Sequence, residues 1–321
     1  MPSEFELIAR YFTRAPRTAL LGVGDDCALV KAPDGLALAI STDMLVEGTH
    51  FFAATDPQAL GHKTLAVNLS DLAAMGADPR WVTLALALPT ADEAWVAAFA
   101  RGFFAIADRF DIELIGGDTT RGPLNLCVTV IGTSPKGLAL RRDGARVGDD
   151  VWLSGETGAA SLAVALRRGE LELDAIGTID ATACALRLDQ PEPRVALGRA
   201  LRTVASSAID VSDGLAADLG HIAERSRVAI MLEWHQMPIP TVLRHLDTKR
   251  QQQAVLAGGD DYELAFTAAP DAAERVRKAA DKAGVVVTRI GRVAAGAGVQ
   301  VIDAAGQQIT PDRAGFDHFG A

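Results

Sequence analysis

The chain has 321 residues, a hydrophobic content of 49% and a formal net charge of −10. This length suggests two domains, the hydrophobic content excludes global disorder, and the acidic balance argues against non-specific nucleic-acid binding. Three widely spaced cysteines without a CxxC pair argue against a structural zinc site or a disulfide framework. The N-terminus is acidic and no uncharged apolar stretch of about 18 residues occurs. We therefore expect a cytoplasmic protein without a signal peptide or a membrane partner.

The N-terminal half mixes predicted helices and strands without a strict βαβ repeat. Apolar periodicity and turn residues predict helices over 4–13, 57–75 and 94–110. They predict strands over 28–30, 36–42, 81–88, 112–115 and 124–131. The segment IGGDTTRGP, between the last two strands, is expected to form a loop.

A segment rich in Gly, Arg and Asp, residues 134–150, predicts the domain boundary. Beyond it we expect strands over 151–154, 207–211, 228–233, 262–267 and 285–290. Helices are expected over 158–168, 194–204, 214–225 and 271–283, with a polar helix near 241–253. The irregular mixture in both halves favours an α+β fold over a doubly wound parallel sheet.

Five short segments place aspartates at tight turns or on a helix face. They are GVGDDCA (22–28), STDMLVEGTH (41–50), NLSDLAAMGADP (68–79), IGGDTTRGP (115–123) and AIDVSDGL (208–215). Carboxylates repel phosphate, so this set suits a phosphate ligand only if hard cations lie between them, and Mg²⁺ prefers such oxygen ligands. We therefore predict a site for magnesium and phosphate.

Several of these residues also have a purely structural interpretation. Asp26 follows glycines in what can be an ordinary β-turn, and Asp43 can cap the end of a strand. His50 lies near an apolar segment, where a histidine is more often structural than catalytic. Asp213 can be the N-cap of the helix that follows it. Turns that are unrelated to one another seldom all contain aspartate. The joint occurrence of these aspartates therefore favours the functional interpretation.

Other acidic residues have weaker structural alternatives. Asp71 lies three residues after Asn68 on one face of an apolar helix, where a buried carboxylate needs a cation or donors. Asp210 ends a strand and has no capping role. Two glycines before Asp118 allow the backbone to approach a ligand closely. Because neither a GxxxxGK[ST] loop nor a protein-kinase HRD-type loop is present, a phosphoryl-transfer enzyme of this kind would neutralise charge mainly with metals.

The ordered motifs GVGDDCA, STDMLVEGTHF, KTLAVNLSDLAAMGADP, IGGDTTRGP, AIDVSDGL and GGDDYEL resemble those of bacterial thiamine-monophosphate kinases, across essentially the whole chain. These enzymes belong to the superfamily of aminoimidazole ribonucleotide synthetase and selenophosphate synthetase. The resemblance implies an N-terminal α+β domain (1–136) that binds ATP and magnesium and dimerises. It also implies a C-terminal α+β domain (137–321) that closes over nucleotide and substrate. The implied reaction is in-line transfer of the ATP γ-phosphoryl group onto thiamine monophosphate, assisted by several Mg²⁺ ions, in a homodimer.

The same resemblance implies roles for individual residues. The implied metal ligands are Asp26, Ser41, Thr42, Asp43, Asp71, Asp118, Asp210 and Asp213. The implied ATP contacts are Gly117, Asp118, Arg142 and Ser212, and the implied substrate contacts are His50, Asp260 and Phe316. Among these, Asp118, Asp43 and Arg142 are expected to act on the phosphoryl transfer itself. The Phe316 ring offers a face for cation–π contact with the thiazolium ring of the substrate.

One residue departs from the family pattern. The family usually has Glu where this chain has Asp260, and the shorter side chain can leave a water in between or shift the contact to Asp261. Two other functions stay open: a superfamily member that activates an amide or selenide, and a Mg–nucleotide sensor without catalysis. Cys27 lies in an acidic turn with no glycine-rich loop before it, which disfavours a selenide enzyme. The many mutually repelling carboxylates disfavour a sensor.

Overall fold

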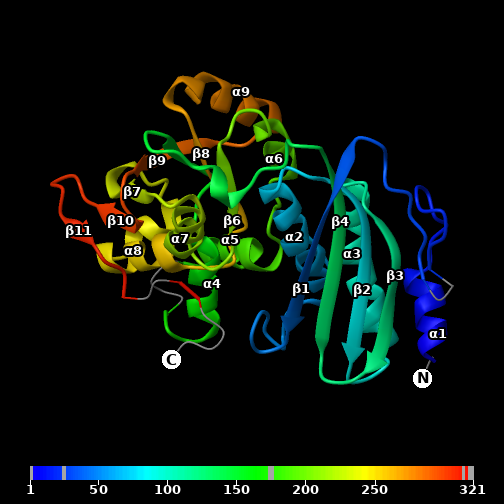
Figure 1. The fold of residues 1–321 in the computed structure, drawn as a ribbon. Coiled ribbons are helices and arrows are strands. Elements are labelled where there is room, and N and C mark those ends of the chain that lie inside the picture. Colours follow the sequence, from blue (N-terminus) through cyan, green and yellow to red (C-terminus); the bar gives the residue numbers. More distant parts are fainter. Residues whose placement is uncertain (1–2, 24–26, 173–176, 313–314, 317–321) are drawn as a thin grey trace. The chain divides into compact units, whose positions relative to one another are not determined.

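The computed structural model describes residues 3–23, 27–172, 177–312 and 315–316. The chain forms two compact units: unit 1 is Met1–Leu72 with Ala77–Gly137, and unit 2 is Ala73–Gly76 with Leu138–Ala321. Each unit has its own sheet and its own helices (Figure 1). Among the described residues, no helix is both long enough and apolar enough to cross a bilayer. The roles predicted for 1–136 and 137–321 stay predictions.

Unit 1 is built on a four-stranded sheet in the order β1-β4-β2-β3. Strand β4 pairs antiparallel with β1 and β2, and β2 pairs parallel with β3. The strands are β1 (Leu36–Val46), β2 (Asp78–Leu88), β3 (Glu113–Arg121) and β4 (Asn125–Pro135). The helical elements are α1 (Glu4–Leu7), the π-helical η1 (Ile8–Phe12), α2 (Pro57–Ala74) and α3 (Glu93–Arg109).

Helices α2 and α3 pack closely together at two glycines. A Cβ on Gly61 would lie 2.1 Å from the carbonyl oxygen of Phe99, and a Cβ on Gly102 would lie 1.8 Å from that of Gln58. Only glycine fits at such a backbone contact. Figure 1 shows both helices behind the sheet. The buried apolar residues of the sheet include Val82, Leu84, Leu126, Val128 and Val130.

The other face of the sheet carries exposed apolar side chains. On β1, Leu38, Ile40 and Met44 are 42%, 63% and 53% exposed. Strand alternation places these even-numbered residues on the face opposite Ser41 and Asp43. Unit 1 therefore has one covered face and one apolar face open to solvent in a single copy of the chain.

Unit 2 is built on a seven-stranded sheet in the order β11-β10-β7-β9-β5-β8-β6. The β7–β10 pair is parallel and the other pairs are antiparallel. The strands are β5 (Asp150–Ser154), β6 (Ser207–Val211), β7 (Ala229–Glu233), β8 (Glu263–Ala268), β9 (Val287–Ala294), β10 (Gly298–Ile302) and β11 (Gln308–Ile309). The α-helices are α4 (Ala159–Arg167), α5 (Thr178–Asp189), α6 (Val195–Leu201), α7 (Leu215–Ser226), α8 (Thr248–Ala257) and α9 (Ala273–Ala283). Short 3-10 turns are η2 (Arg142–Gly144), η4 (Trp234–Gln236), η5 (Thr241–His245) and η6 (Pro270–Ala272).

The predicted α+β class is confirmed, and most predicted elements are present. The helix predicted over 57–75 is α2, which Gly76 follows in the left-handed region with a φ of 60°. The prediction of a loop over IGGDTTRGP was wrong, because Gly116–Arg121 belong to β3. Parallel pairing with β2 gives the backbone of these residues its partners even though the glycines break the apolar pattern. Helix α5 and the β10–β11 hairpin were not predicted.

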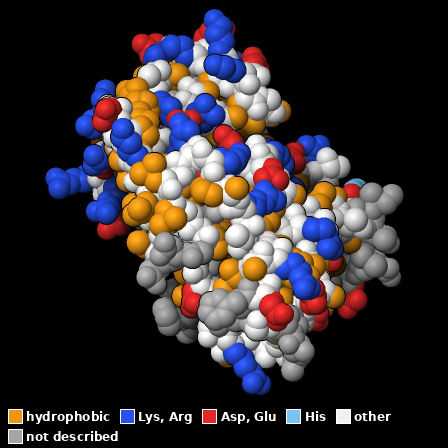
Figure 2. Space-filling view, turned by 90° about the vertical axis from the view of Figure 1, so that its right-hand side faces the viewer, with side chains coloured by type: hydrophobic (Ala, Val, Ile, Leu, Met, Phe, Trp, Pro, Cys, Tyr) orange, Lys and Arg blue, Asp and Glu red, His pale blue; other side chains and the backbone are white. Residues whose placement is uncertain are grey.

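Figure 2 shows one face of the molecule. Lys and Arg side chains are interspersed there with Asp and Glu side chains and with small hydrophobic areas. This mixture is typical of a protein surface without a single-sign field. The expectation that nucleic acid is not a partner stays a prediction.

Candidate functional site

Predicted ligands of unit 1 gather where β1 faces α2. Ser41 Oγ donates a hydrogen bond of 2.5 Å to Asp71 Oδ2. The backbone N–H of Asp43 donates to Asn68 Oδ1 at 3.1 Å, and Asn68 is fully buried. Strand alternation and the three-residue helical spacing produce this meeting of the two elements. Hydroxyl, amide and carboxylate oxygens, the donor types that Mg²⁺ prefers, are thus close together.

Thr42 lies between Ser41 and Asp43 in the chain, but its side chain is on the other face of the sheet. Its hydroxyl shares a hydrogen bond of 2.8 Å with Thr129 Oγ1. The Thr42 hydroxyl therefore does not belong to the same oxygen set as the side chains of Ser41 and Asp43. A contact from Thr42 to an ion held by those side chains would have to come from its backbone carbonyl.

Gly117 and Asp118 lie on β3, at the opposite edge of the sheet from β1. Across the sheet, Asp43 pairs with Val128, Val128 pairs with Leu84, and Leu84 pairs with Gly117. Three inter-strand steps of about 4.8 Å separate the ends of this row by roughly 14 Å. Asp118 is exposed and follows Gly117 in β3. Because successive side chains of a strand alternate between the two faces, the Asp118 side chain is on the face opposite that of Asp43. One copy of the chain does not bring Asp43 and Asp118 together.

The backbone at Gly117 presses against β2. A Cβ on Gly117 would lie 1.9 Å from the carbonyl oxygen of Leu84, which only glycine avoids. A small cavity of about 40 Å³ borders this point. Its lining consists of Ile8, Phe12, Val23, Leu84, Leu86, Leu114 and residues 116–119. Gly117 therefore lets the backbone of β3 approach β2 closely, and Asp118 places a polar group beside an apolar cavity.

His50 is held by the turn that follows β1. Its Nδ1 accepts the backbone N–H of Val46 at 3.0 Å. In the neutral imidazole the proton is then on Nε2, which makes that nitrogen a hydrogen-bond donor. The turn therefore sets the tautomer that a phosphate ligand would meet.

In unit 2 the predicted residues converge on the loop Val211–Gly214, which joins β6 to α7 and is here named the Asp213 loop. The backbone N–H groups of Ser212, Asp213 and Gly214 all donate to Asp218 Oδ2, at 3.0, 3.1 and 3.2 Å. Asp218 lies in the first turn of α7. Asp218 was not among the predicted residues, although an acidic residue in the first turn of a helix is a known partner for free N–H groups.

The carbonyl groups of the Asp213 loop are bound from neighbouring segments. The backbone N–H of Tyr262 donates to Val211 O at 2.8 Å, and that of Asp260 donates to Ser212 O at 2.8 Å. The backbone N–H of Phe316 donates to Asp213 O at 2.9 Å. The loop that carries Ser212 and Asp213 therefore also positions Asp260 and Phe316.

Negative charge accumulates around the Asp213 loop. Asp210 is 5% exposed and Asp218 is 3% exposed. Burial, together with the charges of Asp210 and Asp213, raises the pKa of Asp218 to about 8, although its backbone donors act in the opposite direction. Carboxylates in such a place are costly unless a cation accompanies them. The donor set of unit 2 therefore also fits a hard cation.

The GGDDYEL segment has unusual backbone geometry. Asp260 and Tyr262 have φ values of 66° and 52°, in the left-handed region that non-glycine residues rarely adopt. Tyr262 Oη donates to Asp260 Oδ1 at 3.2 Å. Such strain persists only where the surroundings enforce it, and it is frequent at functional sites. Here the backbone hydrogen bonds from Asp260 and Tyr262 to the Asp213 loop hold this geometry.

Asp261 is bound within the fold. Its carboxylate oxygens accept the backbone N–H of Gly158, at the start of α4, at 2.9 and 3.0 Å. It is 9% exposed, and burial raises its pKa well above the usual range. The suggestion that Asp261 takes over the substrate contact of Asp260 therefore has no support, because its carboxylate caps a helix.

Arg142 lies in the short turn η2. Ser226 Oγ donates to the Arg142 carbonyl at 2.8 Å, and the Arg142 side chain is exposed. The neighbouring Arg141 is bound to Asp143 through two hydrogen bonds. Arg142 is thus a guanidinium on a fixed backbone, as an anion contact requires.

Within unit 1 the predicted ligands fall into two groups, and further predicted ligands belong to unit 2. Among the described residues, no three His, Cys, Asp or Glu side chains come together in a metal-holding arrangement. Ser41, Asp43 and Asp71 form one group, Asp118 lies at the far edge of the sheet, and Asp210 and Asp213 belong to unit 2. Asp26 lies outside the described residues. The assignment of eight metal ligands stays a prediction.

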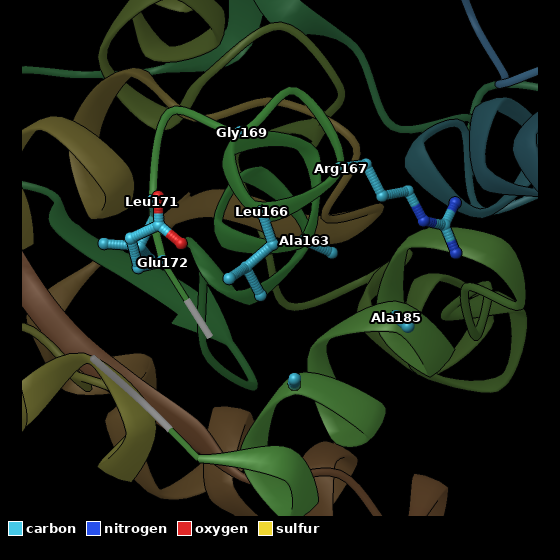
Figure 3. A pocket seen from close by; sticks show the side chains of 8 residues that line it. Ala163, Leu166, Arg167, Gly169, Leu171, Glu172 and Ala185 are labelled. Atoms are coloured by element: carbon cyan, nitrogen blue, oxygen red, sulfur yellow. The ribbon is translucent and has the colours of Figure 1, made fainter. Parts of the chain in front are cut away.

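A larger cavity in unit 2, of about 370 Å³, contains none of the predicted site residues. It is lined by α4, α5 and the segment between them, at Ala163, Leu166, Arg167, Gly169, Leu171, Glu172, Ala181 and Ala185. Figure 3 shows the Arg167 side chain extending away from Leu166 and Leu171. The guanidinium of Arg167 is bound to Asp189. Size alone does not mark this cavity as the site.

Comparison with known proteins agrees with the geometry of both units. Residues 24–134 match the model of the AIR synthase related protein, N-terminal domain, and residues 146–304 match that of its C-terminal domain. The thiamine-monophosphate kinase of Escherichia coli (strain K12) is 44% identical over 324 residues, which cover 98% of each chain.

Solved structures give the same result. The crystal structure of thiamine-monophosphate kinase from Stenotrophomonas maltophilia K279a has a TM-score of 0.84 and 50% identity, covering 92% of this chain and 94% of that one. The structure of AaThiL complexed with AMPPCP and TMP has a TM-score of 0.76 and 30% identity, covering 92% of each chain. The chain therefore belongs to the thiamine-monophosphate kinase family, within the AIR synthase related proteins.

Proposed function

We propose that this chain transfers the γ-phosphoryl group of ATP to thiamine monophosphate and so produces thiamine diphosphate. The observation that carries the proposal is the 44% identity to the Escherichia coli thiamine-monophosphate kinase across 98% of both chains. The related structure with AMPPCP and TMP supports the use of a nucleotide together with this substrate. The Asp213 loop adds support, because it links Ser212 to Asp260 and Phe316 by backbone hydrogen bonds. A cytoplasmic location stays a prediction.

In this proposal the terminal phosphate of the substrate is the nucleophile in a direct in-line transfer. It is already anionic at neutral pH, so no strong general base is required. The protein has to position two polyanions and neutralise their charge. Several Mg²⁺ ions, when bound, would supply positive charge that lowers the repulsion between the phosphates.

The oxygen groups of both units are the proposed ligands of these ions. Ser41, Asp43 and Asp71 would bind in unit 1, and Asp210 and Asp213 in unit 2. Asp26, Asp118 and the Thr42 backbone remain further proposed ligands.

Other side chains would bind and orient the two phosphates and the ring. The Arg142 guanidinium would hold the ATP phosphates as a fixed cation. His50 would donate its Nε2 proton to a phosphate oxygen. Phe316, which is 46% exposed, would offer its ring to the thiazolium.

We further propose that the functional form is a homodimer. In one copy Asp43 and Asp118 lie on opposite edge strands, and the face with Leu38, Ile40 and Met44 is apolar and exposed. A second copy on that face would cover it, and each site of the dimer would then draw residues from both copies.

The direct test is phosphoryl transfer from ATP to thiamine monophosphate with Mg²⁺, followed by chromatography of thiamine diphosphate. Thiamine without a phosphate serves as the control substrate, and a site built for a terminal phosphate should reject it. Product from the monophosphate alone supports the proposal. Absence of product from a folded, ATP-binding protein would contradict it.

Mixed dimers test whether one site uses residues from two copies. Asp43→Asn and Asp118→Asn should each abolish turnover alone. If the site is shared, random mixing gives half the dimers one intact site, so about a quarter of the normal activity returns. If both residues act from the same copy, or the protein is monomeric, no activity returns.

A further inference from the structure

We infer that Asp218 is a positioning residue that holds the Asp213 loop in the geometry required for nucleotide and metal binding. This inference rests on the proposed kinase function, because that function assigns Ser212 and Asp213 to the nucleotide and the metal. Asp218 itself would touch neither ligand. It would act through the backbone of the loop.

Asp218 binds several backbone donors at once. One oxygen, Oδ2, accepts three consecutive backbone N–H groups at 3.0–3.2 Å. The helix N-cap, Gly214, has no side chain to bind them and has a φ of 128°. Without Asp218 these N–H groups would lose their acceptor at a point where Gly214 is free to change conformation.

The Asp213 loop is bound on its carbonyl side as well. Tyr262, Asp260 and Phe316 each donate a backbone N–H to it. A Cβ on Gly259 would lie 2.5 Å from the Ser212 carbonyl oxygen, so the two segments are in tight contact. A shift of the loop must therefore move the Asp260 segment and the backbone at Phe316. Asp218 would then affect substrate binding and nucleotide binding together.

Asp218 is also deeply buried. It is 3% exposed, so its three N–H donors are shielded from water. A buried acceptor keeps the loop in one conformation, which is the property that a ligand-positioning loop needs.

The test compares Asp218→Ala and Asp218→Asn with a matched control, Asp149→Ala. Asp149 is 4% exposed and accepts the backbone N–H of Arg146 and the hydroxyl of Ser206, neither of which is a predicted site residue. The measurements are the Kd of the Mg²⁺ complex of AMPPCP, the half-saturating Mg²⁺ concentration, KM for both substrates, and Tm. Hydrogen exchange at residues 212–214 reports the loop directly.

Asp218→Ala should raise the Kd and the half-saturating Mg²⁺ concentration by roughly 10- to 100-fold, raise both KM values, and speed hydrogen exchange in the loop. Asp218→Asn keeps one acceptor oxygen and should recover most of this loss. Asp149→Ala should lower Tm without changing the ligand constants. If Asp218→Ala does not fold, Asp218→Asn is decisive, since its loop exchange must still exceed that of the wild type.

The inference is overturned if both Asp218 variants bind the nucleotide as the wild type does, or if Asp149→Ala loses binding in proportion to Tm. Failure of the proposed function would look different. In that case the wild type makes no thiamine diphosphate, while the binding and exchange measurements still report on Asp218.

Discussion

Two buried carboxylates, Glu113 in unit 1 and Asp218 in unit 2, each accept three backbone N–H groups, but their pKa values shift in opposite directions. Glu113 accepts the backbone N–H groups of Arg17, Thr18 and Ala19, together with the Thr18 hydroxyl. Burial raises its pKa, but these hydrogen bonds outweigh burial and its pKa lies below the usual range. Asp218 also accepts three backbone N–H groups, yet its pKa rises to about 8.

Burial is the main cause of the raised pKa of Asp218, and its neighbours add to the difference. Glu113 is surrounded by donors and anchors the N-terminal segment to the sheet, where Trp81 Nε1 also donates to Thr18 Oγ1 at 3.0 Å. Asp218 is crowded by the carboxylates of Asp210 and Asp213. A carboxylate among donors stabilises the fold, whereas several carboxylates together are an electrostatic cost that a bound cation can offset. The comparison therefore separates an anchor from a ligand site.

The sharpest test of this comparison is Asp210→Asn. If the crowded carboxylates serve a cation, turnover should fall by about 10²–10⁴-fold, equivalent to roughly 3–5 kcal/mol in the barrier. The same change removes a repelling charge, so Tm without Mg²⁺ should stay the same or rise. Kinetics and thermal unfolding in EDTA measure both. Normal turnover, or a marked loss of stability in EDTA, would show that the crowded carboxylates do not serve a cation.

Close backbone packing fixes predicted ligands in unit 1, whereas a hydrogen-bonded loop fixes those in unit 2. The second test concerns the packing in unit 1. Gly117→Ala should cost about 1–3 kcal/mol in the free energy of unfolding, because its Cβ would collide with Leu84. Gly116→Ala is the matched control, since its Cβ would meet only Thr83 Cγ2 at 3.9 Å. Urea unfolding of the two variants should differ clearly. Equal stability would mean that β3 can move away from β2.

The third test addresses the anchor. Glu113→Gln should lower the free energy of unfolding by about 1–3 kcal/mol at pH 7, since its donors keep only a neutral partner. The lowered pKa of Glu113 means that its stabilisation is present above the ordinary value of 4.5 and is lost as pH falls through the folded-state pKa. The difference between variant and wild type should therefore shrink below pH 4.5. Denaturation curves from pH 3 to 8 would measure this; a constant difference would contradict it.

The smallest expected effect is that of Phe316→Ala. An exposed cation–π contact contributes about 0.5–1 kcal/mol, so KM for thiamine monophosphate should rise about two- to fivefold with little change in kcat. The backbone hydrogen bond to Asp213 remains in this variant. Steady-state kinetics with Phe316→Leu as the control separate ring stacking from simple packing. An equal KM for all three proteins would remove the ring from the site.

Local patterns were enough to predict most of the fold and the type of chemistry. The helix predicted over 57–75 is α2, which begins at Pro57, and the strand predicted over 207–211 is β6. The motifs with aspartate, glycine and hydroxyl residues pointed to oxygen ligands for cations, since these depend on residue type and not on distant contacts. Helix α5 was missed because the apolar residues of its sequence, TIDATACALRLD, are mostly small and show only weak periodicity.

Tertiary structure alone decided where the ligand residues lie relative to one another within each unit. Strand order separated Asp43 from Asp118, which no local pattern encodes, because sheet order depends on pairing between distant segments. Folding likewise turned Asp261 into a helix cap and gave Asp218 its three backbone donors. The sequence by itself determined the family and the donor chemistry, since these are carried by residue identity. The long-range hydrogen bonds and strand register determined which of those donors can act together.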